Sequence, residues 1–221
     1  MDDITDALGH SFGLWVIDTE SVPGGSAGTK HRACECGKTE TASYTNPLTD
    51  VPNGKYFSKP IFWAYENGIT KGKTATEFQR DVACTRKQIV TFLWRAAGQP
   101  EPESMDNPFE DVKRGDQFEK AILWAYYSGI TKGTDDTHFS PENPCTRKQI
   151  VMFLWRFHNK PEPESMENPF SDVKRGDQFE KAILWALGEG ITTGKTKTTF
   201  EPESPCTRGQ IVTFLYRSVV Q

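Results

Sequence analysis

The chain has 221 residues, a formal net charge of −4 and a pI near 5.7. This charge gives no general attraction for nucleic acid or an anionic membrane, so affinity for an anion must come from locally placed Arg and Lys side chains. No apolar run approaches the roughly 18 residues of a membrane span. The acidic start, Met1-Asp2-Asp3-Ile4, does not resemble a signal peptide. If the protein is exported, we therefore expect the chain to be a C-terminal fragment of something longer.

Residues 1–44 differ in pattern from the rest and predict a small β-rich module. The apolar segment 12–17 favours a strand, and the glycine-rich segment 21–28 favours a turn or loop. Two further strands are expected at 30–33 and 39–42. Nothing in this module indicates a function.

Two cysteines of the N-terminal module, Cys34 and Cys36, lie close together, and His10 or His31 could join them on zinc. Two thiolates separated by one residue, without a second cysteine pair, fall short of a structural zinc site. Free thiols are favoured over a strained disulfide or zinc. The sequence therefore predicts no metal and no cofactor.

The remaining chain is repetitive. The segment Cys84–Val90, CTRKQIV, returns at 145–151 and, as CTRGQIV, at 206–212, with the same step each time. A long fixed period indicates repeats that bury part of their apolar faces against each other. The predicted domains are the N-terminal module 1–44 and three repeats, 45–100, 106–160 and 167–221, with Pro/Glu spacers between the repeats.

Each repeat reads as helix, loop, helix. In the second copy the first helix contains Phe118, Ala121, Ile122 and Ala125, and Gly129 is a natural helix stop. The next helix starts at a Thr-x-x-Gln capping box, Thr146 to Gln149. The cysteine before each cap is expected to be a small buried side chain.

An arginine follows the capping threonine in every copy: Arg86, Arg147 and Arg208. A cation in the first helical turn opposes the helix dipole and typically loses about 0.3–1 kcal/mol. A local rule broken three times suggests function. Free backbone N–H groups, the dipole and a guanidinium would together bind an anion such as a carboxylate. The alternative is a structural salt bridge from each arginine to Asp111 or its equivalents.

Other recurring side chains have simpler interpretations. Trp63, Trp124 and Trp185 keep the same step as the cysteines, and aromatic residues at helical spacing are usually core. The four histidines do not recur, and neither a nucleophile elbow nor a phosphate loop is present. The sequence therefore predicts a protein that is not an enzyme.

The order of motifs resembles the S-layer homology domain. The second copy contains Phe109-Glu110-Asp111-Val112, Ala121-Ile122, Gly129-Ile130-Thr131-Lys132-Gly133, Phe139-Ser140-Pro141 and Thr146-Arg147. The resemblance covers about residues 46–221. The N-terminal module resembles, more weakly, small repeats in exported proteins of gut bacteria.

The resemblance implies a mainly α fold, with three helix-loop-helix repeats in a pseudo-threefold bundle. It also implies a non-catalytic module that anchors exported proteins to an anionic, pyruvylated-type cell-wall polysaccharide at the bacterial cell surface, in grooves between repeats. Neither nucleic acid nor membrane insertion is expected, whereas fused upstream domains are. Carried over by position, the polysaccharide-binding residues are Arg86, Arg147, Arg208, Asp50, Asp111, Asp172, Tyr56, Gly72, Gly133 and Gly194.

One departure from the family pattern affects this expectation. The family's aromatic residue before Ala-Ile is Tyr56 in the first copy but Gln117 and Gln178 in the others. Phe118 and Phe179 lie one place later and are interpreted as core. The groove of the first copy is therefore expected to bind sugar best. The alternative function is a protein–protein or host-facing interaction scaffold that keeps the fold without binding polymer.

Overall fold

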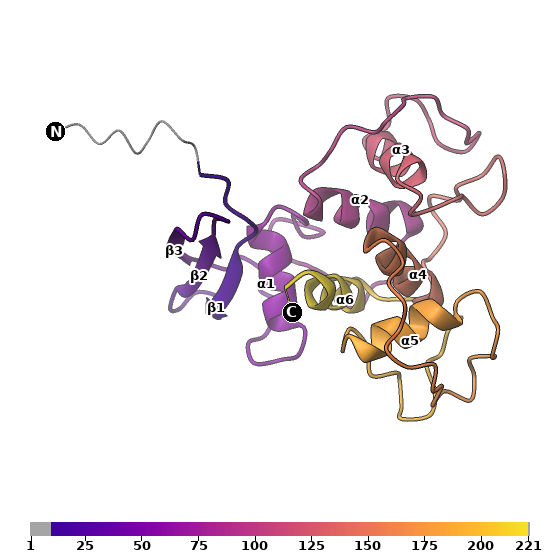
Figure 1. Cartoon of the computed structure of the whole chain (residues 1–221). Coiled ribbons are helices and arrows are strands. Elements are labelled where there is room, and N and C mark those ends of the chain that lie inside the picture. Colours follow the sequence, from indigo (N-terminus) through magenta and orange to yellow (C-terminus); the bar gives the residue numbers. More distant parts are fainter. Residues whose placement is uncertain (1–9, 221) are drawn as a thin grey trace. The chain divides into compact units, whose positions relative to one another are not determined.

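The computed structural model describes residues 10–220 (Figure 1). This part contains three strands and six helices. The chain divides into two compact units, Met1–Phe78 and Gln79–Gln221. No helix among the described residues combines the length and the apolar character that crossing a membrane requires.

The N-terminal unit contains an antiparallel sheet, as predicted, in the order β1 (Val16–Thr19), β2 (Gly28–Ala33) and β3 (Thr39–Tyr44). The first strand starts later than expected, because Phe12 joins the sheet only through an isolated bridge to Cys34. Helix α1 (Ser58–Glu66) packs against β1.

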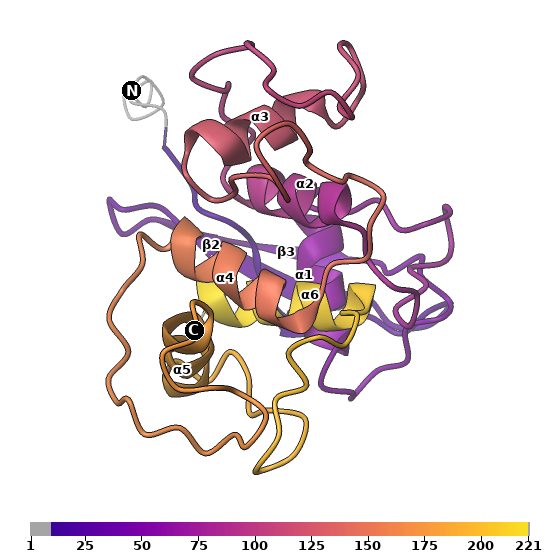
Figure 2. The same ribbon diagram turned by 90° about the vertical axis from the view of Figure 1, so that its right-hand side faces the viewer.

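The second unit contains five helices among its described residues, and they follow the predicted helix-loop-helix order. They are α2 (Arg86–Ala96), α3 (Glu119–Tyr127), α4 (Arg147–Phe157), α5 (Glu180–Gly188) and α6 (Arg208–Val220). Helix α2 packs against α3 and α4 against α5, so each of these contacts joins the second helix of one repeat to the first helix of the next (Figure 2). Helix α3 ends just before Gly129, whose φ of 71° stops it as expected.

The three recurring cysteines meet at the helix starts of the second unit. The amide of Cys84 donates to the carbonyl of Cys206 at 3.0 Å, Cys145 donates to Cys84 at 2.8 Å, and Cys206 donates to Cys145 at 2.8 Å. This closed cycle of backbone hydrogen bonds joins the segments that precede α2, α4 and α6. All three side chains are fully buried, which confirms the prediction of small core residues.

The tryptophans also occupy the predicted core, since Trp63, Trp124 and Trp185 are all buried. Two further tryptophans anchor the spacers. The indole Nε1 of Trp94 donates to the carbonyl of Pro100, and that of Trp155 to Pro161, both at 2.7 Å.

Candidate functional site

The helix starts confirm the predicted capping boxes. A capping box is present at Thr85 and at Thr146, and the glutamine three residues on accepts from the threonine amide at 3.1 and 3.0 Å. The expectation of free N–H groups at these starts is wrong. The amide of Arg86 donates to the carbonyl of Asn143 at 2.9 Å, and that of Lys87 to Pro141 at 3.1 Å.

The same bonds recur one repeat later, where the amides of Arg147 and Lys148 donate to Ser204 and Pro202, both at 3.0 Å. Loop carbonyls of the following repeat therefore occupy the donors that an anion would need. Sequence alone does not reveal this, because the partners lie in another repeat, far away along the chain. The helix start therefore joins two repeats, and these two backbone amides are not available to a ligand.

The predicted arginines are buried, with exposed fractions of 3–4%. The Nε atom of Arg86 donates to the carbonyl of Phe139 at 2.8 Å, and its guanidinium lies 4.8 Å from that ring centroid. Arg147 repeats both contacts on Phe200, at 2.8 and 4.7 Å. The guanidinium of Arg208 lies 5.7 Å from the ring of Phe92.

Burial lowers the pKa of Arg86, while Cys145 and Asp111 act in the opposite direction. An arginine nevertheless stays protonated in proteins. Within residues 10–220, Arg86 forms no ion pair, and its Nη2 atom has no hydrogen-bond partner. The salt bridge to Asp111 that the sequence left open is therefore absent, and the guanidinium keeps its positive charge.

The predicted aspartates order the loops. The carboxylate of Asp111 accepts from the amides of Phe139 at 2.9 Å and Ser140 at 2.7 Å. Asp172 accepts in the same way from Phe200 and Glu201, at 2.9 and 2.8 Å. Ser140 and Glu201 have positive φ values of 57° and 56°, so each carboxylate stabilises a strained turn. In the N-terminal unit, Asp50 accepts from the amide of Phe78 at 2.8 Å.

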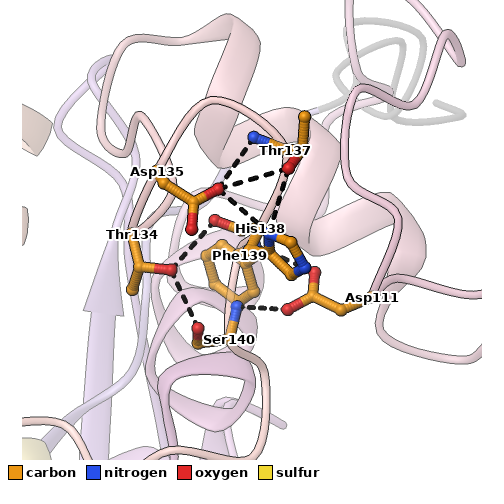
Figure 3. A network of polar contacts seen from close by, with 7 residues as sticks. All are labelled: Asp111, Thr134, Asp135, Thr137, His138, Phe139 and Ser140. Carbon is orange, nitrogen blue, oxygen red and sulfur yellow. Dashed lines mark hydrogen bonds and ion pairs between the residues drawn. The ribbon is translucent and has the colours of Figure 1, made fainter.

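Figure 3 shows that Asp111 lies beside a loop network that includes His138. The hydroxyl of Thr134 donates to the carbonyl of His138 at 3.1 Å, and Nδ1 of His138 lies 3.0 Å from Asp135. This hydrogen bond and the nearby charge raise the pKa of His138. The hydrogen bond from the amide of Thr137 is the main cause that lowers the pKa of Asp135.

The predicted glycines have the left-handed backbone that their loops require, with φ values of 80° at Gly72, 89° at Gly133 and 83° at Gly194. A Cβ atom at Gly133 would lie 2.6 Å from the carbonyl oxygen of His138 and 2.8 Å from the Phe109 ring. Tyr56 is 64% exposed in the N-terminal unit, where Asp50 and Gly72 also lie.

One groove unites residues of all three repeats. Arg86 of the first copy, Gly133 of the second and Gln178 of the third line a groove of about 340 Å³. The others lining it are Thr131, Lys132, Thr134, Gln149, Met152, Phe153, Arg156 and Phe179. The structure thus brings together a predicted arginine, a predicted loop glycine and the position equivalent to Tyr56.

Two further pockets are equivalent to each other. The first, of about 160 Å³, is lined by Lys87, Asp111, Val112, Lys113, Asp116, Phe118, Ile122, Pro141 and Glu142. The second, of about 210 Å³, is lined by Lys148, Asp172, Val173, Lys174, Asp177, Phe179, Ile183, Pro202 and Glu203. Every lining position of the first pocket recurs in the second at the period of the repeat, so Asp111 and Asp172 line equivalent pockets.

Sequence reasoning missed the lysine and phenylalanine of these pockets. The ammonium of Lys87 pairs with Glu142 and lies 4.6 Å from the ring centroid of Phe118, which is half-buried rather than core. Lys148 pairs with Glu203 and lies 4.8 Å from the Phe179 ring. The signal in the sequence that could have indicated them is that Lys87 and Lys148, like Phe118 and Phe179, recur at the period of the repeat. In the third copy Gly209 replaces the lysine.

Comparison with known proteins finds one family that matches each of the three repeats. The S-layer homology domain matches residues 47–90, 108–151 and 169–212. The chain is 31% identical over 77% of its length to an endoglucanase of Bacillus sp. (strain KSM-635), and 28% identical over 67% to an amylopullulanase of Thermoanaerobacterium thermosulfurigenes. It is 26% identical over 80% to the middle cell wall protein of Brevibacillus brevis (strain 47 / JCM 6285 / NBRC 100599).

The chain spans only 18%, 8% and 15% of these three relatives, so the similarity concerns one part of much longer proteins. The three domain matches together cover more than half of the chain and include all three recurring helix starts. The chain therefore belongs to the S-layer homology domain family.

Proposed function

We propose that this chain anchors a longer exported protein at the bacterial cell surface by binding an anionic, pyruvylated-type cell-wall polysaccharide. S-layer homology domains are cell-wall anchoring modules, and the relatives named above include a cell wall protein. The proposed contacts are made by side chains in the grooves at the repeat junctions. No catalytic domain is part of this proposal.

The observation that carries the proposal is the groove beside Arg86. Its buried guanidinium has an Nη2 atom without a protein partner in the described chain, and the groove next to it is lined by Gly133 and Gln178. A carboxylate of an acidic sugar suits such a donor, because charge-assisted hydrogen bonds are the strong ones. The Lys87 and Lys148 pockets add a cation and an aromatic ring each.

We also propose that the three repeats form a pseudo-threefold bundle around the cysteine cycle. Each cysteine backbone donates to one neighbour and accepts from another. The proposed domain bounds remain 45–100, 106–160 and 167–221. By their position in the family pattern, the further proposed polysaccharide-binding residues are Asp50, Tyr56, Gly72, Gly194, Arg147 and Arg208.

Sedimentation with cell-wall sacculi, before and after the secondary polymer is stripped, tests this function. The wild-type chain should bind intact sacculi and not stripped ones. Replacing both Lys87 and Lys148 by Ala should weaken binding about tenfold or more, since a hydrogen bond to a charged group contributes roughly 1.5–3 kcal/mol. Arg86→Ala should weaken it as well.

The matched control replaces Lys120 and Lys181 by Ala. These two lysines also recur at the repeat period, but they pair with Glu101 and Glu162 on the spacers and line none of the described pockets. The control removes the same amount of positive charge as the Lys87 and Lys148 variant. Because its two lysines lie outside the pockets, the control should bind sacculi like wild type. Circular dichroism checks that both double variants are folded. If both then lose sacculus binding equally, the proposal that the pocket lysines bind the polymer specifically is contradicted.

The alternative function, an interaction scaffold that keeps the fold without binding polymer, is favoured by Gln178. This residue lines the groove where the family places an aromatic side chain for stacking on sugar. Failure of the folded wild-type chain to bind either intact or stripped sacculi would support the scaffold.

A further inference from the structure

The N-terminal unit brings three metal-ligating side chains together outside the repeat grooves. Nδ1 of His10 lies 3.3 Å from Sγ of Cys36, and the ligand atoms of His10, Cys34 and Cys36 all lie within 4.8 Å of one another. His10 and Cys36 are exposed and Cys34 is half-buried, so an ion can enter from solvent. The sequence favours free thiols here, with zinc bound through His10 or His31 as an alternative. Among the described residues, the structure places His10, and not His31, next to the two thiols.

Backbone pairing holds the two arms of this cluster side by side. Phe12 forms an antiparallel bridge with Cys34, and the amide of Gly13 donates to the carbonyl of Ala33 at 3.0 Å. The segment that carries His10 is therefore fixed next to the end of β2. The cluster is built by sheet pairing between distant segments.

A tight turn brings the two thiols onto one side. The amide of Cys34 donates to the carbonyl of Lys38 at 2.8 Å, and the amide of Gly37, at a φ of 86°, donates back to the carbonyl of Cys34 at 2.9 Å. The amide of Cys36 points at Sγ of Cys34 at 3.4 Å. An N–H group directed at sulfur favours the thiolate form, which is the form that binds metals.

We propose that His10, Cys34 and Cys36 bind one zinc ion, with a fourth coordination position open to solvent. Zinc bonds of about 2.3 Å to sulfur and 2.0–2.1 Å to nitrogen place tetrahedral ligand atoms about 3.5–3.8 Å apart. Ligand atoms within 4.8 Å of one another need to approach by only about 1 Å to reach this geometry. Zinc displaces one proton from each thiol on binding, so affinity rises with pH.

Zinc and cobalt titrations of the reduced, metal-free chain test the site. Zinc added against a chromophoric chelator should bind with a stoichiometry of one. Cobalt should give a thiolate-to-cobalt charge-transfer band and the visible spectrum of a tetrahedral ion. His10→Ala should weaken zinc binding by about tenfold or more, because loss of even an outer-shell partner typically lowers affinity 10–100-fold. Replacing both Cys34 and Cys36 by Ser should abolish the charge-transfer band.

His31→Ala is the matched control, because His31 lies on the same sheet but pairs with Asp18 at 2.6 Å. This variant should bind zinc like wild type. The proposal is overturned if wild-type protein binds less than one equivalent, if cobalt gives no sulfur band, or if His10→Ala and His31→Ala bind equally. A Cys34–Cys36 disulfide that persists in reductant and excludes zinc overturns it as well. The cobalt spectrum of the wild type does not depend on whether any variant folds.

Discussion

Arg86 and Phe139, which belong to successive repeats, are joined by a 2.8 Å hydrogen bond from the guanidinium Nε to the loop carbonyl. The amide of the same phenylalanine donates to Asp111 at 2.9 Å. The arginine and the aspartate expected at the site therefore act on two sides of one loop residue instead of pairing with each other. Arg86 is therefore compatible with a structural role and with a ligand-binding role. Its Nε atom is hydrogen-bonded to the next repeat, and its side chain also lines the groove.

Arg86→Ala should lower the free energy of unfolding by roughly 1–3 kcal/mol, because the buried carbonyl of Phe139 loses its donor. Arg86→Lys should lose less, since it keeps the charge. Urea unfolding followed by circular dichroism measures both values. Arg114→Ala, at an exposed position, should stay within about 0.5 kcal/mol of wild type. Equal stability of Arg86→Ala and Arg114→Ala would show that the hydrogen bond from Arg86 to the Phe139 carbonyl does not contribute to the free energy of unfolding.

Gly133→Ala should destabilise the protein more than Gly129→Ala. Both glycines have positive φ, so both substitutions introduce backbone strain on the order of 1–3 kcal/mol. Only at Gly133 does the new Cβ also meet backbone, 2.6 Å from the carbonyl of His138, whereas nothing lies within 4 Å at Gly129. Thermal unfolding of the two variants gives the comparison. A smaller loss at Gly133 would mean that the loop moves aside without cost.

The local structure of the repeats could be predicted from the sequence, because its determinants lie close together along the chain. The Thr146 and Gln149 pair lies within one helical turn, and Gly129 stops α3 by its own backbone preference. The partners between repeats could not be predicted. That Phe139 faces Arg86, and that loop carbonyls occupy the helix-start amides, depends on how segments of different repeats pack together.

Thiol labelling should divide the five cysteines into two classes. Cys34 and Cys36 are accessible and should react with a thiol reagent in the native, metal-free protein. Burial raises the pKa of Cys206 to about 12 and that of Cys145 well above its usual range, and a neutral buried thiol is inert. We expect two thiols to react under native conditions and three more only in denaturant. Rapid labelling of Cys145 in the native protein would contradict the burial of this side chain at the cycle of backbone hydrogen bonds.

The loop beside Asp111 should titrate through His138 and Asp135. Asp135 raises the folded-state pKa of His138, so the stabilisation from His138 is present below its unfolded pKa and is lost as the pH rises through the folded value. The pKa of Asp135 is lowered, so its contribution is lost as the pH falls through that lowered value. The pair is therefore fully charged between the two folded pKa values.

Asp135→Asn should return the pKa of His138 toward its ordinary value, because the main cause of the upward shift is the hydrogen bond to this carboxylate. Imidazole chemical shifts followed by NMR across the titration measure the change. Asp136→Asn removes the same charge one position later without removing that bond, so it should lower the pKa much less. If both variants lower the pKa of His138 equally, general loop charge and not the 3.0 Å contact sets it.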